Sequence, residues 1–482
     1  MEEHGAGGAE KGTSVSAPPP LESAPPEARS HRTRRESRAR KTAYAGVAAR
    51  AANYLIRLFA VPLSLTMLGR TQYGLWLTVG SVLVWLGLSD LGISTGLVNM
   101  VSRAYGKEDW EEARGYVSTG LFCYTFLAAL ALAAVLAGSM WPGLPAFIGV
   151  RESGHLASEA RELFVVCGAV WAASFSIGAI DSLCLALQEG YFKNYAQIGA
   201  GVLSLGALAA LAWRGGSLIA FALVMGLPPL AADVVLTAYF LYWRHPHLRP
   251  SLRHWRKRYL KGLLHIGGPM AVVQLADVAI MYSINIMIAN RLGAASLPLY
   301  AVPATAFIVI TGLIYNWTSP YLSAFAEATA RGDWHWIRQA ALRNLSLAVA
   351  AMAAGSAGLV VLGPYVISFW THRQVVPGRM LLLCLGLFYI MMTWASTNGT
   401  LLVGLGMVKT KAALECAVAA VYVGLSWACL PKFGLTAVPL AGCVAYGIDV
   451  LLSLPLALRR IGHSAAERIP LARQPAAAGE TA

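Results

Sequence analysis

Two arginines and an asparagine share one face of the first long apolar segment of the chain. Arg50 and Arg57 are seven residues apart with Asn53 between them, so in a helix the three side chains lie along two turns of one face. An ionised side chain inside a membrane costs roughly 2.5–3.5 kcal/mol and usually faces a water-filled cavity or a partner. Because the planar guanidinium binds phosphate oxygens through two parallel hydrogen bonds, the pair suits a phosphate-bearing ligand. The alternative is a structural ion pair with Asp277 or Asp233.

A second polar stripe follows helical spacing in the seventh apolar segment. It consists of Gln274, Asp277 and Asn285, and an internal repeat with an offset of 224 residues places Gln274 opposite Arg50 and Asp277 opposite Asn53. Two related helices that both carry such a stripe predict one shared substrate cavity lined by all six residues. Asp277 is also a candidate for H⁺ or Na⁺ coupling, because burial in a helix bundle raises the pKa of a carboxylate.

Three further acidic residues lie in or at the ends of apolar segments. Asp90 ends the second segment, where we expect a helix-end or gate contact. Asp181 and Asp233 lie inside the fourth and sixth segments and are candidate ion-pair partners for the two arginines, or ion-coupling groups.

The composition predicts an all-α polytopic membrane protein. Hydrophobic residues make up 57% of the 482 residues and charged residues 13%, about half the charged fraction of a soluble chain. The apolar stretches are continuous rather than alternating, which indicates helices of ~20 residues and not a barrel. Twelve transmembrane helices are predicted, at residues 43–68, 73–91, 116–138, 163–187, 194–213, 216–242, 262–289, 298–320, 340–363, 379–403, 413–430 and 435–458.

The basic residues are distributed as in a membrane protein with both termini in the cytoplasm. With that orientation 28 of the 38 Lys and Arg lie on the cytoplasmic side and eight on the other. This asymmetry explains the formal net charge of +14 without a nucleic-acid partner. We therefore expect the chain to lie in the lipid bilayer and to bind no nucleic acid.

Three matched sequence pairs indicate an internal duplication. Leu68-Gly69 matches Leu292-Gly293, and Asp109-Trp110 matches Asp333-Trp334, both at an offset of 224 residues; Gly190 and Lys193 match Gly406 and Lys409 at an offset of 216. Since each half has six helices, we expect two parallel, pseudo-symmetric six-helix bundles around a central cavity. The predicted parts are a disordered basic cytoplasmic tail (1–42), an N-terminal bundle (43–243), a basic cytoplasmic loop (244–261), a C-terminal bundle (262–460) and a disordered cytoplasmic tail (461–482).

The sequence argues against enzymatic chemistry and against cofactors. It has no GxxxxGK[ST] phosphate-binding loop. His155 and His372 lie in loops without clustered partners, so no metal site is expected. A transferase would need a catalytic carboxylate or histidine in a long ordered loop, and the longest loop on the outer side covers only residues 139–162.

Several short stretches resemble one transporter family. They are residues 72–76 (QYGLW), 89–93 (SDLGI), 104–109 (AYGKED) and 186–190 (ALQEG), together with the basic loop in mid-chain. Over roughly residues 43–460 the chain resembles the polysaccharide transporters and O-antigen flippases of the multidrug/oligosaccharidyl-lipid/polysaccharide (MOP) exporter superfamily.

That resemblance implies a function and a place. A relative of this family is a bacterial inner-membrane flippase that moves an undecaprenyl-diphosphate-linked oligosaccharide by alternating access, in lipopolysaccharide or exopolysaccharide biosynthesis. A polysaccharide polymerase and glycosyltransferases are then candidate protein partners. The alternative is a cation-coupled multidrug antiporter of the same superfamily, which would depend on Asp277 and would be disfavoured by arginines that repel cationic drugs.

Overall fold

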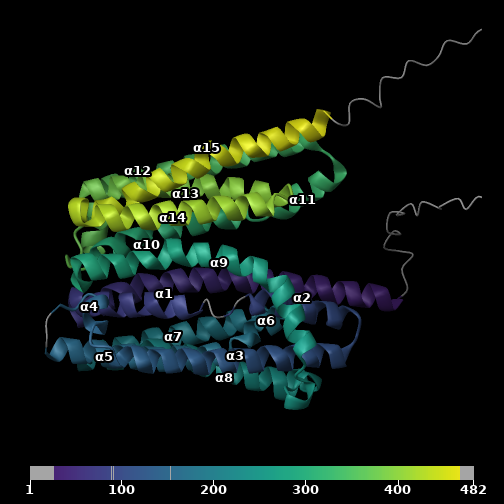
Figure 1. Ribbon diagram of the computed structural model, residues 1–482, viewed down its shortest axis with the longest axis horizontal. Coiled ribbons are helices and arrows are strands. Elements are labelled where there is room, and N and C mark those ends of the chain that lie inside the picture. Colours follow the sequence, from purple (N-terminus) through teal and green to yellow (C-terminus); the bar gives the residue numbers. More distant parts are fainter. Residues whose placement is uncertain (1–25, 88–89, 91, 152–153, 467–482) are drawn as a thin grey trace, which may run out of the picture.

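The computed structural model describes residues 26–466 apart from 88–89, 91 and 152–153, and this part of the chain is helical without a strand (Figure 1). The α-helices are α1 (Pro26–Gly87), α2 (Ile93–Gly106), α3 (Trp110–Met140), α4 (Leu144–Phe147), α5 (His155–Ile177), α6 (Ala179–Ala186), α7 (Tyr191–Arg214), α8 (Leu218–Ala238), α9 (Lys257–Leu292), α10 (Leu297–Thr318), α11 (Tyr321–Arg331), α12 (Trp334–Trp370), α13 (Arg379–Gly404), α14 (Val408–Phe433) and α15 (Ala437–Ala466).

The helices confirm the predicted membrane protein. Ten stretches of the described chain are long and apolar enough to cross a membrane. Two of them, Arg40–Gly87 and Val408–Gly462, contain two crossings each, because the chain reverses at Gly69 and at Gly434, both with positive φ. The ten stretches therefore correspond to the twelve predicted spans.

Equivalent local structures recur in the two halves of the chain, at the ends of the first and seventh spans and at the beginnings of α3 and α12. Gly69 and Gly293 both have left-handed φ angles, of 67° and 87°, which a residue without Cβ adopts at little cost. Asp109 caps α3 by accepting a hydrogen bond from the N–H of Glu112 (2.8 Å). Asp333 caps α12 in the same way through the N–H of Trp336 (3.1 Å). The 224-residue repeat is thus visible in the backbone.

The third sequence match is out of register. Gly406 has a φ of 76°, whereas Gly190 has a φ of −57°. The left-handed residue before α7 is Gln188, with a φ of 59°, so the structural offset in this region is 218 residues rather than 216. With that offset Lys193 corresponds to Lys411 and not to Lys409.

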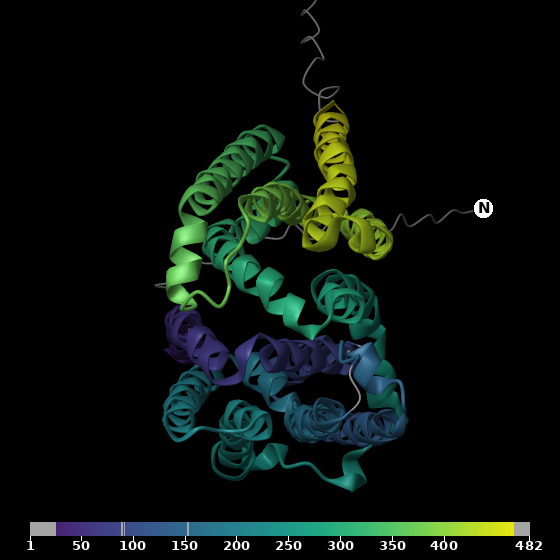
Figure 2. The ribbon, with the colours of Figure 1, turned by 90° about the vertical axis from the view of Figure 1, so that its left-hand side faces the viewer.

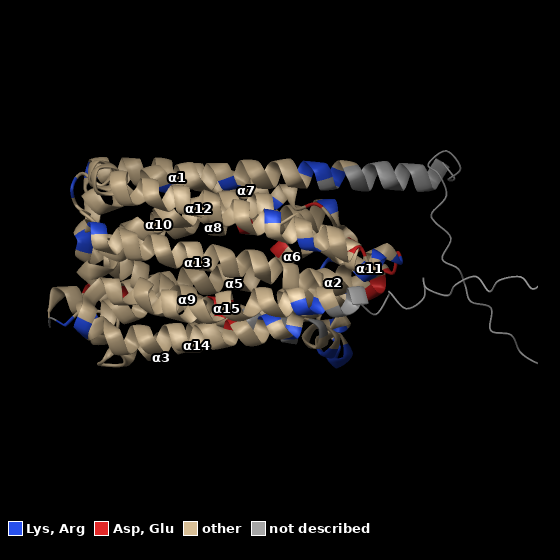
Figure 3. Cartoon of the chain, turned by 90° about the horizontal axis from the view of Figure 1, so that it is seen from above, with Lys and Arg blue, Asp and Glu red and all other residues tan. Residues whose placement is uncertain are grey.

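The helices form two groups that meet along α1, α9 and α10. In Figures 1 and 2, α1 to α8 lie on one side and α10 to α15 on the other, with α9 between them. Helix α9 packs against α1 and α2 of the N-terminal half and against α14 of the C-terminal half. We call the end with the described termini the terminal face and the opposite end, with Gly69 and Gly293, the far face. Lys and Arg gather mainly at the two ends of the helices (Figure 3).

The described part of the N-terminal tail is a helix, not the disordered segment that we expected. Helix α1 begins at Pro26, and residues 26–42 continue the first span without a break. This stretch is rich in Arg, which favours helix, and Arg38 binds Glu189 of the α6–α7 connection (3.2 Å). The C-terminal helix likewise runs to Ala466, past the predicted boundary at residue 461. Residues 1–25 and 467–482 lie outside the described part of the chain.

Candidate functional site

The stripe on α1 faces the C-terminal half of the molecule. The guanidinium of Arg50 donates a hydrogen bond to the side-chain oxygen of Asn316 on α10. One turn further, the Tyr54 hydroxyl reaches α10 at Gly312, where a Cβ would lie 2.0 Å from the hydroxyl oxygen. Asn53 and Arg57 are exposed. No carboxylate forms a salt bridge with Arg57 among the described residues, so no described acidic side chain neutralises its charge.

The stripe on α9 is divided between two neighbours. Gln274 and Asp277 are exposed, and the charge of Asp277 interacts with those of Lys411 and Glu415 on α14. Further along α9, Asn285 is half-buried and donates a hydrogen bond to the Ser81 hydroxyl in the second span (3.0 Å). The α9 stripe thus meets α14 at one end and α1 at the other.

The two predicted stripes therefore lie at two related seams. The first span meets the eighth through Arg50 and Asn316, and the seventh meets the second through Asn285 and Ser81. Within the described chain, no hydrogen bond or ion pair joins one stripe to the other. The shared cavity that we expected between them stays a prediction.

Asp181 and Asp233 bind a lysine and not the arginines of the first span. The ammonium of Lys193, in the first turn of α7, lies 2.7 Å from the Oδ1 atoms of both carboxylates. The Lys193 side chain is 13% exposed and that of Asp233 is 18% exposed. The expected ion pairs with Arg50 or Arg57 were wrong because Lys193, which hydropathy places in a loop, turns into the bundle.

A related cluster in the C-terminal half was missed by the sequence analysis. Lys411, in the first turn of α14, binds Glu415 (2.6 Å) and interacts with the charge of Asp449 on α15. Asp449 is 1% exposed, and its Oδ1 atom has no hydrogen-bond partner within the described chain. The 218-residue offset from Lys193 to Lys411, and the 216-residue offset from Asp233 to Asp449, are the sequence signals that would have found it.

Asp90 stabilises the break between α1 and α2. Its carboxylate accepts hydrogen bonds from the backbone N–H (3.0 Å) and hydroxyl (2.6 Å) of Ser94 and from the Tyr124 hydroxyl (2.8 Å). These contacts fit the helix-end role that we expected for this residue, and its role as a gate stays a prediction.

A fully buried carboxylate joins three segments at the terminal face. Glu189 is 0% exposed and binds Arg38 of α1, Arg244 (2.8 Å) and His245 (3.2 Å). Burial alone would favour the neutral acid, but the hydrogen bonds from His245 and Arg244 outweigh it and lower the pKa of Glu189 to about 2. The residue holds the N-terminal extension of α1 against the segment that follows α8.

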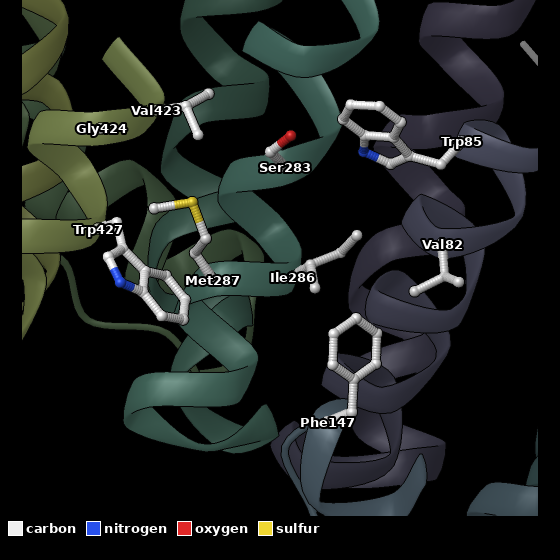
Figure 4. Close-up of a pocket in the computed structure, with 9 residues that line it drawn as sticks. All are labelled: Val82, Trp85, Phe147, Ser283, Ile286, Met287, Val423, Gly424 and Trp427. Carbon is white, nitrogen blue, oxygen red and sulfur yellow. The ribbon is translucent and has the colours of Figure 1, made fainter. Parts of the chain in front are cut away.

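An apolar cavity lies where α1, α4, α9 and α14 meet. It measures about 530 Å³, and its lining side chains project into the space between these helices (Figure 4). Two indoles, Trp85 and Trp427, stand on opposite sides of it, and Ser283 is the one polar side chain among its nine lining residues. Without a charged group in this lining, the cavity suits hydrocarbon rather than an anionic head group.

Comparison with known proteins finds a distant relative and several structures with a similar fold. No protein-family model matches the chain. A curated Salmonella typhimurium protein, named provisionally as an O-antigen transporter, is 21% identical over 424 residues, covering 83% of this chain and 92% of that protein.

Solved structures with the same fold are MOP-superfamily transporters. An inward-facing multidrug resistance MATE transporter aligns with a TM-score of 0.74 at 16% identity, over 86% of this chain and 96% of its own. An outward-facing MATE structure has a TM-score of 0.60 at 15% identity, over 89% and 96%. A MOP transporter from Pyrococcus furiosus has a TM-score of 0.58 at 16% identity, over 86% and 96%.

The chain is therefore a multi-pass membrane protein with the fold of the MOP-superfamily transporters. The resemblance to the polysaccharide transporters of that superfamily, drawn above from short sequence stretches, is confirmed by the O-antigen transporter relative.

Proposed function

We propose that this transporter is a flippase for an undecaprenyl-diphosphate-linked oligosaccharide in the bacterial inner membrane. The observation that carries the proposal is Arg57, an exposed guanidinium deep in the first span without a salt bridge to any described carboxylate. An uncompensated cation at this depth is costly unless a ligand or water compensates it. A diphosphate offers the bidentate, doubly charged partner that the guanidinium prefers.

Alternating access at the α1–α10 and α9–α1 seams would move the head group while the lipid chain stays in the bilayer. Contacts between the halves are dense at the far face, where Arg151 donates to the carbonyls of Asn290 (3.2 Å) and Arg291 (3.0 Å). These contacts support a state that is closed at the far face. The TM-score points the same way, because it is higher for the inward-facing MATE structure (0.74) than for the outward-facing one (0.60). With both termini cytoplasmic, this state would receive cargo made in the cytoplasm. Glycosyltransferases and a polymerase would supply and consume it.

The test is export by Arg57→Ala in a strain that depends on this gene for surface polysaccharide. We expect Arg57→Ala to lose export while it inserts into the membrane at normal levels. Arg57→Lys should restore little export, because an ammonium group lacks the planar pair of donors with which a guanidinium binds phosphate. Arg343→Ala, which removes an exposed arginine of α12, is the matched control and should export normally. Normal export by Arg57→Ala would remove the basis of the proposal.

One observation favours the second candidate, a cation-coupled multidrug antiporter. Asp277 is an exposed carboxylate inside the seventh span that forms no salt bridge within the described chain. It could take up H⁺ or Na⁺, or a cationic drug. Drug efflux from vesicles that is lost in Asp277→Asn, in a strain with normal polysaccharide, would select this function instead.

A further inference from the structure

A second cavity lies along the seam between α1 and α12, close to the far face. It measures about 630 Å³ and is bounded by one turn of α1 and by the C-terminal end of α12 with its following turn. Helix α1 contributes Leu58, Phe59 and Pro62, and α12 contributes Phe369 and Trp370. We call this cavity the α1–α12 groove.

The walls of the groove are apolar and are not covered by protein. Phe369 is 88% exposed and Phe59 is 59% exposed, within spans whose surroundings are hydrocarbon. Apolar side chains that stand free around a cavity of this size suit one linear hydrocarbon chain. Ser368 of α12 also lines the groove, and its buried hydroxyl has no hydrogen-bond partner within the described chain.

The end of the groove at the far face carries a histidine and an arginine on a turn that is held by hydrogen bonds. His372 and Arg373 are exposed and have left-handed φ angles of 50° and 62°. Non-glycine residues adopt this conformation at a cost in free energy, and such strained residues are found mostly at functional sites. The buried hydroxyl of Thr371 fixes the turn by donating to the carbonyl of Ile367 (2.8 Å) and accepting from the N–H of Val375 (3.1 Å). No acidic side chain forms a salt bridge with Arg373 among the described residues.

The two sides of the groove belong to the two halves of the molecule. Pro62 has no N–H, so the carbonyl of Leu58 lacks its intrahelical donor. The indole N–H of Trp370 donates to that carbonyl instead (2.6 Å). Since this bond closes the seam, the groove changes shape when the halves separate at the far face.

We propose that the α1–α12 groove is the site from which the carried lipid leaves toward the outer leaflet. The isoprenoid units next to the head group lie between Phe59 and Phe369, and the diphosphate binds Arg373. This inference rests on the proposed function and assigns to the cargo a second cationic site beyond Arg57. The apolar cavity of Figure 4 lacks a cation in its lining and could not bind the head group.

The test is photocrosslinking of the full chain in nanodiscs of phosphatidylethanolamine and phosphatidylglycerol that contain tritiated undecaprenyl diphosphate. A benzophenone amino acid replaces Phe369, and the control carries it at Val361, exposed on the same helix outside the groove. We expect tritium at position 369 only. Adding Arg373→Gln should reduce the label about tenfold, the cost of one charge-assisted contact, whereas Arg373→Lys should retain most of it.

Three outcomes would overturn the groove assignment: crosslinks to phosphatidylglycerol alone, equal tritium at positions 369 and 361, or no effect of Arg373→Gln. A flipping assay with the unmodified protein in liposomes separates this failure from failure of the proposed function. Flipping without crosslinking at position 369 rejects the groove and leaves the flippase standing. Absence of flipping rejects the flippase, and the groove assignment with it.

Discussion

Lys193 and Lys411 occupy equivalent positions in the two halves of the protein, each in the first turn of its helix and each bound to a carboxylate. Lys193 binds Asp181 and Asp233, and Lys411 binds Glu415 beside the buried Asp449. The ammonium groups therefore neutralise acidic residues inside both bundles, where unpaired carboxylates would be costly.

The Lys193 cluster should contribute measurably to stability. Lys193→Met keeps the length of the side chain but leaves two carboxylates without a cation, so we expect a loss of about 1–3 kcal/mol and a lower melting temperature in detergent. Adding Asp233→Asn should recover part of the loss, because one fewer charge is left unpaired. If the double variant melts below Lys193→Met, the two side chains do not act as a pair.

Gly74 should control closure at the far face. A Cβ at this position would lie 1.9 Å from the carbonyl oxygen of Ala294, a backbone atom that cannot move aside cheaply. We expect Gly74→Ala to separate the halves and to abolish transport. The measurement is the distance between spin labels at Met140 and Phe433, both exposed at the far face. Gly80→Ala is the matched control, since nothing lies within 4 Å of its added Cβ. Equal label distances in both variants would contradict the prediction.

The Trp370 indole should stabilise the same closed state. Trp370→Phe removes the donor to the Leu58 carbonyl, and we expect a loss of about 0.5–1.5 kcal/mol. Pro62→Ala supplies an intrahelical N–H to that carbonyl, so Trp370→Phe should cost less in a Pro62→Ala background. A double-mutant cycle of melting temperatures checks this coupling, and additive losses would show that the two residues are independent.

Glu189 should make the protein acid-sensitive. Its pKa falls from 4.5 to about 2 on folding, so ionised Glu189 stabilises the fold fully above pH 4.5 and this contribution disappears as the pH falls toward 2. Glu189→Gln should lose on the order of 3 kcal/mol at neutral pH and show a flatter melting profile between pH 4.5 and 2. Glu327→Gln, which removes an exposed pair with Arg331, should keep the wild-type profile. An unchanged acid profile in Glu189→Gln would assign the stability to other groups.

The positions of the spans could be predicted from sequence because ~20 apolar residues are a strong and local signal. The breaks inside spans could not be predicted in this way. Gly178 separates α5 from α6, yet the predicted fourth span runs through this place, whereas the interruption at Asp90 coincides with the predicted end of the second span. The repeat was visible at Gly69 and Gly293 because both turns require the same backbone conformation.

The polar interior was predicted less well, for a physical reason. Lys193 and Lys411 follow short turns, and a window of hydropathy places any lysine near a turn in the loop. Their burial depends on carboxylates from other helices, such as Asp233 and Asp449, which become neighbours only through tertiary packing. The partner of Arg50, Asn316, is 266 residues away and carries no charge that would have marked it in the sequence.

The long first helix also connects movements at the two ends of the protein. The indole of Trp370 donates a hydrogen bond to the carbonyl of Leu58. From Leu58 to its beginning at Pro26, α1 extends roughly 48 Å at 1.5 Å per residue, which is well beyond the thickness of the hydrocarbon core. Because Arg38 binds Glu189, the N-terminal end of α1 must move together with the rest of the N-terminal half. A small rocking motion at the far face would thus appear as a larger displacement of the beginning of α1 at the terminal face.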